Sequence, residues 1–281
     1  MKIARPTSLV QWTTAGLLAL ATNPAFAQAQ GLLDNAVVVD AGAFVISTSI
    51  KGNLNGQSVR NPEINFGEVF GTAGHDASPR IDALWRINPH HHLRFTTFAH
   101  GRSGSKVIDR DIQWGDHTFK ADAKVTSELK VQVYELAYEY AFLRGRDHEV
   151  SASVGIHDQR MSARVSGSAI HAAADGGMAT LQTQSNSVSA PLPMIGVRAG
   201  WVVSPQWYVE GRLQTFGLRA GDTRGHWTEM RLGATWMFHP AFGLGLGYNR
   251  FNTQLELSKT RFDGNLKFGY QGIQASLTGT F

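Results

Sequence analysis

Apolar and polar residues alternate one by one along several segments of the chain. In 81–87, 134–142, 150–156 and 230–238, every second residue is apolar, and the residues between them are mostly charged, polar or small. A period of two is that of a β-strand whose two faces meet different surroundings. These segments predict an all-β protein. An antiparallel sandwich also alternates, but its charged residues would face outward and its strands would usually be shorter.

The connections between these segments come in two lengths. We expect short turns near 88–91, 144–147, 204–206 and 239–241, and longer polar loops near 51–78, 103–122, 166–190, 219–225 and 258–262. Ten strands fit between them, at 38–50, 79–88, 92–102, 123–142, 147–165, 194–203, 206–218, 226–238, 242–257 and 263–281. Short periplasmic turns and long extracellular loops are typical of antiparallel transmembrane β-barrels. Eight strands remain possible if one pair is misread, and the facing of 38–50 is ambiguous.

The amino terminus has the layout of a secretory signal peptide. Lys2 and Arg5 precede a short apolar stretch at 15–21, Pro24 follows it, and Ala25 and Ala27 stand where a signal peptidase reads small residues. The stretch is too short to span about 30 Å of hydrocarbon. We expect cleavage after Ala27, so that 1–27 is the signal and 28–281 is the barrel. No later run of eighteen apolar residues predicts a membrane-spanning helix.

Composition narrows the class of partners. Without Lys2 and Arg5 the basic count falls from 26 to 24, against 22 acidic residues, so the charge does not favour nucleic acid as a partner. The chain has no cysteine, which excludes disulfides and a cysteine-linked lipid anchor. Aromatic residues that flank the short turns predict a girdle at the periplasmic boundary. They are Trp85, Phe142, Trp201, Trp207, Trp236, Phe238 and Phe242.

The last strand has the most specific pattern. Ile273, Ala275, Leu277 and the final residue Phe281 share one face, between polar residues. This segment resembles the final strand of Gram-negative outer-membrane β-barrels, and 110–116, 134–142 and 151–155 are broadly similar to barrels of the OmpW and OmpA-transmembrane type. The resemblance implies an outer-membrane location, contact with lipid and lipopolysaccharide, delivery by periplasmic chaperones, and reading of the last strand by the barrel-assembly machinery. It implies no particular activity.

The face opposite the apolar one predicts a charged lumen. Its charged residues are Arg80, Asp82, Arg86, Arg94, Glu135, Glu139, Glu149, Arg198, Glu210, Arg212, Glu229 and Arg231, with His100 and His157 beside them. Charges buried together must pair, and a barrel of about eight strands is nearly filled by its own side chains. We therefore expect a lumen closed by paired charges and a structural or surface-interaction role. A narrow channel is the alternative, because Gly196, Gly200, Gly233, Gly245 and Gly247 would leave space in the lumen.

An outer-membrane enzyme is the third possibility. Such enzymes use pairs of acids, or an acid with His or Ser, and the candidate pairs here are His157–Asp158, Asp109–Asp111, Asp116–His117 and His226–Glu229. Adjacent residues on a strand point to opposite faces, and no Gly-x-Ser-x-Gly pattern occurs, so we expect no catalytic residues.

Two further features predict contacts with solvent rather than chemistry. Consecutive residues rarely converge on one ion, so we expect a solvated turn at His90-His91-His92, and no metal or other cofactor. The stretch 166–190 predicts a mobile, exposed loop of the kind that contacts host surfaces, phage or neighbouring lipopolysaccharide.

Overall fold

A computed structural model describes residues 28–55, 64–65, 67, 74–109, 111–114, 117–171, 180–220, 223–259 and 262–281. The expected signal peptide, 1–27, lies outside these residues. The described chain begins with a 3-10 turn, Gln28–Gln30, and a single helical turn, α1 (Gly31–Asp34). None of the helical segments in these ranges is long and apolar enough to cross a membrane.

Ten long strands follow in the described ranges, with three short ones between them. The long strands are β1 (Val37–Asn55), β3 (His75–Arg86), β4 (His91–Val107), β7 (Lys124–Arg144), β8 (His148–His171), β9 (Thr180–Ser204), β10 (Trp207–Ala220), β11 (Thr223–His239), β12 (Phe242–Lys259) and β13 (Phe262–Thr280). The short strands are β2 (Ile64–Asn65), β5 (Ile112–Trp114) and β6 (His117–Phe119).

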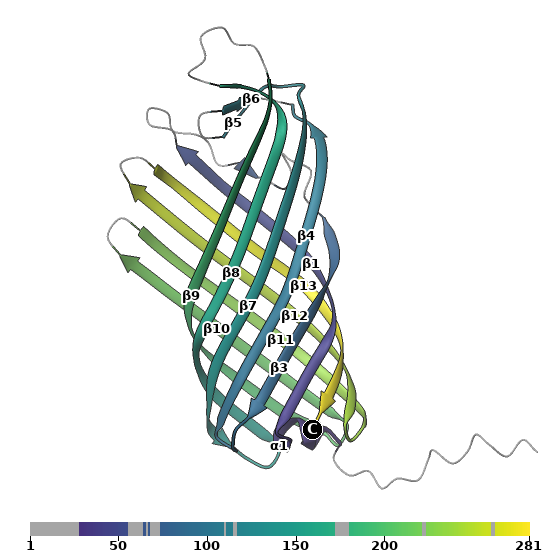
Figure 1. Cartoon of the computed structure of the whole chain (residues 1–281). Coiled ribbons are helices and arrows are strands. Elements are labelled where there is room, and N and C mark those ends of the chain that lie inside the picture. The colour runs from purple at the N-terminus through teal and green to yellow at the C-terminus, as the bar shows by residue number, and fades with distance from the viewer. Residues whose placement is uncertain are drawn as a thin grey trace, which may run out of the picture.

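The long strands close into an antiparallel barrel. Each pairs with the next along the chain, and the first pairs with the last, with Val38 opposite Thr280. Helix α1 and the carboxy terminus lie at the end where the short turns are, and β5 and β6 lie at the other end (Figure 1). The predicted fold class, an all-β antiparallel barrel of ten strands, is confirmed.

Several strands are longer than the sequence predicts. β8 and β9 pair as far as Ala169 opposite Thr180, so 166–171 and 180–190 belong to strands and not to the expected loop. Only 221–222 separate β10 from β11, and only 260–261 separate β12 from β13. The prediction failed here because a strand outside lipid needs no apolar face, and backbone pairing alone carries a segment rich in Ser, Thr and Gln.

The outer surface carries an apolar belt. Trp85 and Trp201 lie beside short turns with 52% and 45% of their surfaces exposed, and Trp207 pairs with Trp236 at the same end. Leu136 and Leu246 are more than half exposed on the same outer face. Exposed apolar side chains in a continuous ring around a barrel match the hydrocarbon layer of a membrane.

Strand β7 changes its apolar face part-way along its length. In the part that runs from Tyr134 to the short turn at 144–147, Tyr134 and Leu136 face outward and Glu135 is buried. In the other part, from Lys124 to Val133, which we call the upper part, Val133 is buried and Gln132 is exposed. The upper part of the strand therefore stands outside the apolar belt, with its polar side outward and its apolar side inward.

The inward apolar side chains of this upper part form a core. The core also includes Phe44 and Phe98 from β1 and β4, Trp227 from β11, and Phe268 and Tyr270 from β13. The barrel thus holds two kinds of interior. One is polar and lies toward the short turns, and the other is aromatic and lies toward the opposite end.

Candidate functional site

The structure places the predicted charged residues inside the barrel. All are buried except Glu210, whose side chain is 17% exposed. His100 and His157 are buried with them. Most of these residues come together in three groups, which lie in order along the lumen.

The first group lies nearest the short turns and centres on Arg198. The Glu139 carboxylate accepts hydrogen bonds from Arg94 Nε at 2.7 Å and Arg198 Nε at 2.8 Å. Arg198 also donates to Glu149 and lies 3.7 Å from Glu210. Arg198 therefore joins acids from β7, β8 and β10 across the lumen.

The second group surrounds Asp82. Its carboxylate pairs with Arg80 Nε at 3.0 Å and with Arg231 Nη1 at 2.6 Å. It also accepts hydrogen bonds from Thr96 Oγ1 at 2.8 Å and Gln274 Nε2 at 3.3 Å. Arg80 donates through a second nitrogen as well, Nη2 at 3.2 Å, so hydrogen bonds from Arg80, Thr96 and Gln274 satisfy both oxygens, as a buried charge requires.

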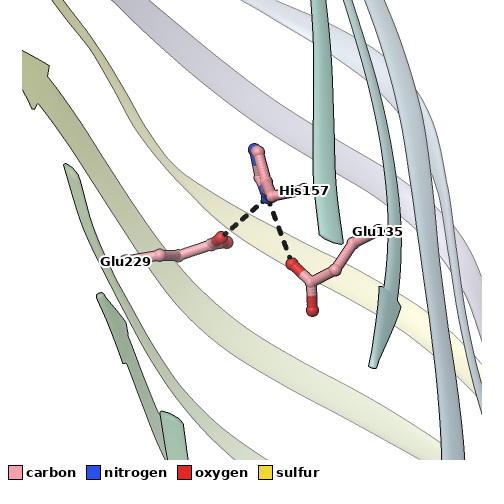
Figure 2. Close-up of side chains that lie close together, drawn as sticks. All are labelled: Glu135, His157 and Glu229. Atoms are coloured by element: carbon pink, nitrogen blue, oxygen red, sulfur yellow. Dashed lines mark hydrogen bonds and ion pairs between the residues drawn. The ribbon is translucent and has the colours of Figure 1, made fainter. Parts of the chain in front are cut away.

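The third group contains Glu135, His157 and Glu229 (Figure 2). His157 Nδ1 lies 3.3 Å from Glu135 Oε2 and 3.8 Å from Glu229 Oε2. The other oxygen of each carboxylate accepts a hydrogen bond from a side-chain amide, from Gln214 at 2.9 Å and from Asn249 at 2.5 Å. All three residues are at most 2% exposed.

Two of the predicted lumen cations are not closely paired with an acid. Arg86 donates instead to two backbone oxygens, of Leu32 at 2.5 Å and Asn35 at 2.9 Å. Arg212 comes no closer than 3.8 Å to Glu135, and its guanidinium makes no hydrogen bond with the described residues. The sequence could not show this, because facing alone does not determine partners.

The amino-terminal segment covers the lumen at the end with the short turns. Ala29, Leu32 and Leu33 are buried there, packed against Tyr208 and Met237. The sequence pattern predicts neither this contact nor the part that Arg144 plays. That residue lies next to a turn, yet its Nη1 donates to Glu149 at 3.0 Å and its Nη2 to Asp34 at 2.8 Å. No periodic pattern marks either feature.

A small cavity of about 50 Å³ lies between the first two groups, with Asp40 and Glu210 in its wall. Gly233 and Gly247 line it, and a Cβ added to Gly233 would meet nothing closer than 3.7 Å. Gly200 differs, because its Cβ would lie 2.1 Å from the Tyr208 hydroxyl, so the tyrosine already occupies that space. The cavity has room for about four water molecules.

Aromatic rings cover the third group on the side away from the short turns. His157 stacks on Phe251, with centroids 5.1 Å apart and planes 9° apart, and Phe251 stacks on Tyr270 at 4.9 Å and 7°. Trp227 lies 5.1 Å from the His157 ring. This layer was not predicted, although the shift of apolar residues from odd to even positions at Val133 and Tyr134 is visible in the sequence.

Comparison with solved structures agrees with this architecture. The outer membrane protease OmpT from Escherichia coli superposes with a TM-score of 0.58 at 12% identity, over 88% of this chain and 97% of that one. The chain folds as an outer-membrane β-barrel. No protein-family model matches the sequence, and no curated protein matches it.

Two further barrels match with lower scores. The toluene transporter TodX from P. putida has a TM-score of 0.38 at 9% identity, over 91% of this chain and 92% of that one. Ail from Yersinia pestis has a TM-score of 0.31 at 10% identity, over 84% and 98%.

The candidate catalytic pairs do not form dyads among the described residues. His157 is buried, whereas Asp158 lies on the outer face and pairs with Arg160 at 3.0 Å. His226 is exposed and Glu229 is buried, so they lie on opposite faces of β11. Asp116 lies outside the described residues.

The remaining pair lies in the connection between β4 and β7. Asp111 accepts a hydrogen bond from Lys120 at 2.7 Å, which lowers the pKa of its carboxyl, and the backbone N–H of Ala121 lowers it further. A carboxylate held ionised by a lysine is a weak general base. Asp109 is exposed, and the structure shows no contact between it and Asp111.

The three consecutive histidines bond to three different partners. His90 Nδ1 lies 2.8 Å from the Ala141 carbonyl oxygen, and His91 Nδ1 lies 2.5 Å from the Tyr138 hydroxyl. His92 is buried, with Nε2 3.2 Å from the Pro89 carbonyl oxygen. Their rings diverge, so this turn does not gather ligands around one ion.

Proposed function

We propose that this protein is an outer-membrane barrel whose lumen is closed to solutes and which has a structural or surface-interaction role, not an enzymatic one. The observation that carries the proposal is Arg198, which joins Glu139, Glu149 and Glu210 from three strands inside the lumen. In this proposal the chain is exported with a signal peptide that is cleaved after Ala27. Because its lumen is closed, the proposal also places the protein with the small barrels that are broadly similar to the OmpW and OmpA-transmembrane type.

The energetics support a closed lumen. Separating a buried ion pair strands a charge at a cost of about 3–5 kcal/mol. A continuous water path would have to pass the amino-terminal segment, the Arg198 and Asp82 groups and the aromatic layer. The cavity between the first two groups is too small to form such a path by itself.

The outer surface supports lipid and lipopolysaccharide as partners. Exposed basic residues lie on the outer face beyond the apolar belt, among them Lys130 on β7, Arg160 on β8 and Arg250 on β12. Guanidinium and ammonium groups bind phosphate, which the lipopolysaccharide headgroup carries. Contact with the barrel-assembly machinery and periplasmic chaperones is part of the same proposal, since a barrel must reach the membrane unfolded.

Planar-bilayer recording of the purified barrel tests the closed state. We expect no steady conductance above that of the bare bilayer. A variant that lacks residues 28–34 should also stay closed, because β1 begins at Val37 and both the charged groups and the aromatic layer remain. Steady openings of the unaltered protein would contradict the proposal and favour the narrow channel. Openings of the truncated variant alone would show that the amino-terminal segment makes the seal.

A further inference from the structure

We infer that Glu135, His157 and Glu229 form a binding site for one divalent transition-metal ion inside the barrel. The residues come from β7, β8 and β11, and one ring nitrogen of His157 points at both carboxylates (Figure 2). One ligand atom from each residue lies within 4.8 Å of the other two. The inference does not depend on whether the lumen conducts.

The two carboxylates are oriented alike. The Gln214 side-chain amide donates a hydrogen bond to Oε1 of Glu135, and the Asn249 side-chain amide donates one to Oε1 of Glu229. Each bond leaves Oε2 turned toward His157 Nδ1, and Glu229 Oε2 has no hydrogen-bond partner in the described residues. Neutral donors that orient the ligating carboxylates are the usual outer shell of a metal site.

The distances fit an ion better than a direct ion pair. A charge-assisted hydrogen bond between an imidazolium and a carboxylate is about 2.7–2.9 Å long. His157 Nδ1 makes a long hydrogen bond of 3.3 Å with Glu135 Oε2 and lies 3.8 Å from Glu229 Oε2. Ligand atoms about 2.1 Å from a tetrahedral ion lie about 3.4 Å apart. The two separations from His157 Nδ1 bracket that value, and the two carboxylate oxygens lie within 4.8 Å of each other.

The local charge also favours a dication. The two carboxylates bring two negative charges into a site from which water is largely excluded. Among the described residues, neither Oε2 is ion-paired with a guanidinium: Arg212 lies 3.8 Å from Glu135 Oε1, the oxygen turned away from His157, and Arg80, which also interacts with Glu229, pairs with Asp82. A proton on His157 would offset one charge at the point where the Oε2 atoms meet, whereas a divalent ion would offset both.

The donor set indicates which ions suit the site. One imidazole and two carboxylates, with no thiolate in the chain, fit Zn²⁺ and its first-row neighbours. Ca²⁺ and Mg²⁺ prefer six or more oxygen ligands, so an imidazole disfavours them. The parallel stack of His157 on Phe251 holds the ring in the orientation that the ligand atoms need.

Metal analysis of the full barrel tests the site. The protein is refolded in detergent with Zn²⁺, passed over a chelating column to remove loose ions, and measured by plasma mass spectrometry. We expect about one Zn²⁺ per barrel, and a loss of at least tenfold in His157→Gln. His100→Gln is the matched control, because His100 is also buried in the lumen but contacts Ser78, at 3.0 Å. Equal metal in the His157 variant and the unaltered protein, or none in either, overturns the inference.

X-ray absorption on the zinc-loaded, unaltered protein gives a second test that needs no variant to fold. We expect one imidazole nitrogen and two or more oxygens around the ion. Two or more imidazoles would place the zinc at other histidines of the chain and overturn the inference. A protein refolded with Ca²⁺ in place of Zn²⁺ should retain less than a tenth as much ion, and equal retention would also overturn it.

Discussion

At the scale of single residues, neutral polar side chains supply the remaining hydrogen bonds to the buried carboxylates. Thr96 and Gln274 do this for Asp82, and Gln214 does it for Glu135. A carboxylate has about four acceptor sites, and on Asp82 the two hydrogen bonds from Arg80 fill only two of them, so the amide and hydroxyl donors satisfy the rest. The lumen is therefore a mixed hydrogen-bond network in which the salt bridges are only a part.

Removing one cation from this network should destabilise the barrel. Arg231→Ala takes the 2.6 Å partner from Asp82, but Arg80 remains at 3.0 Å. We expect a loss at the lower end of the range for a broken buried pair, about 3 kcal/mol. Arg198→Ala should cost more, because three acids lose a cation at once.

Urea unfolding in detergent, followed by tryptophan fluorescence, measures both losses. Arg250→Ala is the control, since Arg250 is exposed on the outer face and should change stability by less than about 0.5 kcal/mol. If Arg231→Ala and Arg250→Ala behave alike, water reaches the Asp82 group and the charges do not seal the lumen.

At the scale of elements, the carboxy-terminal strand closes the barrel through its backbone. The Phe281 N–H donates to the Val37 carbonyl oxygen at 2.8 Å, and the Val37 N–H donates to Phe281 at 2.9 Å. The Phe281 side chain is 65% exposed and fills no part of the lumen. The backbone of this residue therefore belongs to the fold, and its ring is free to serve assembly.

Phe281→Ala should separate the two roles. It keeps both hydrogen bonds to Val37, so the stability of the purified barrel should change by less than about 0.5 kcal/mol. The yield in the outer membrane should fall several-fold, with precursor left in the periplasm, because the aromatic end of the last strand is lost. Quantitative blotting of the two fractions measures this. Deletion of Phe281 should give the same loss of yield plus a loss of stability, and normal yield in both variants would contradict the expected assembly signal.

At the scale of the whole molecule, the barrel stands in two environments. On β7, the outward-facing residues are apolar from Tyr134 toward the short turn at 144–147. They are polar from Gln132 toward the other end of the strand. The inward-facing residues change in the opposite sense, from polar at Glu135 to apolar at Val133. The molecule is thus a membrane barrel with a polar interior, continued by an extension that has its own apolar core.

A pair of substitutions on one strand locates the boundary. Leu136→Arg places a charge in the apolar belt near its edge, and should cost more than about 1 kcal/mol in lipid vesicles but less than the roughly 2–4 kcal/mol of the bilayer midplane. Gln132→Arg, on the same outward face, should cost less than about 1 kcal/mol, because that side chain already stands beyond the belt. Unfolding in vesicles measures both values. Equal costs would show that the membrane extends past Gln132.

The sequence by itself determined the fold class, the number of strands and the positions of the short turns. A strand between lipid and a polar lumen must alternate at every residue, as 134–142 does, so its period and facing are local properties. The same facing pointed to the charged residues that the structure buries, such as Glu139 and Arg198. The ends of β8 and β9 escaped prediction because strands outside lipid carry no such period.

Only the tertiary structure decided which charged residues meet. Arg198 reaches Glu139 and Glu149 because β7, β8 and β9 lie side by side in one register, and Glu135, His157 and Glu229 converge from three strands across the lumen. Arg86 turned to the backbone of the amino-terminal segment, although its facing was the same as that of its neighbours. Facing is determined by the local period of two, but partners depend on register and on the curvature of the closed sheet. Those are properties of the whole barrel.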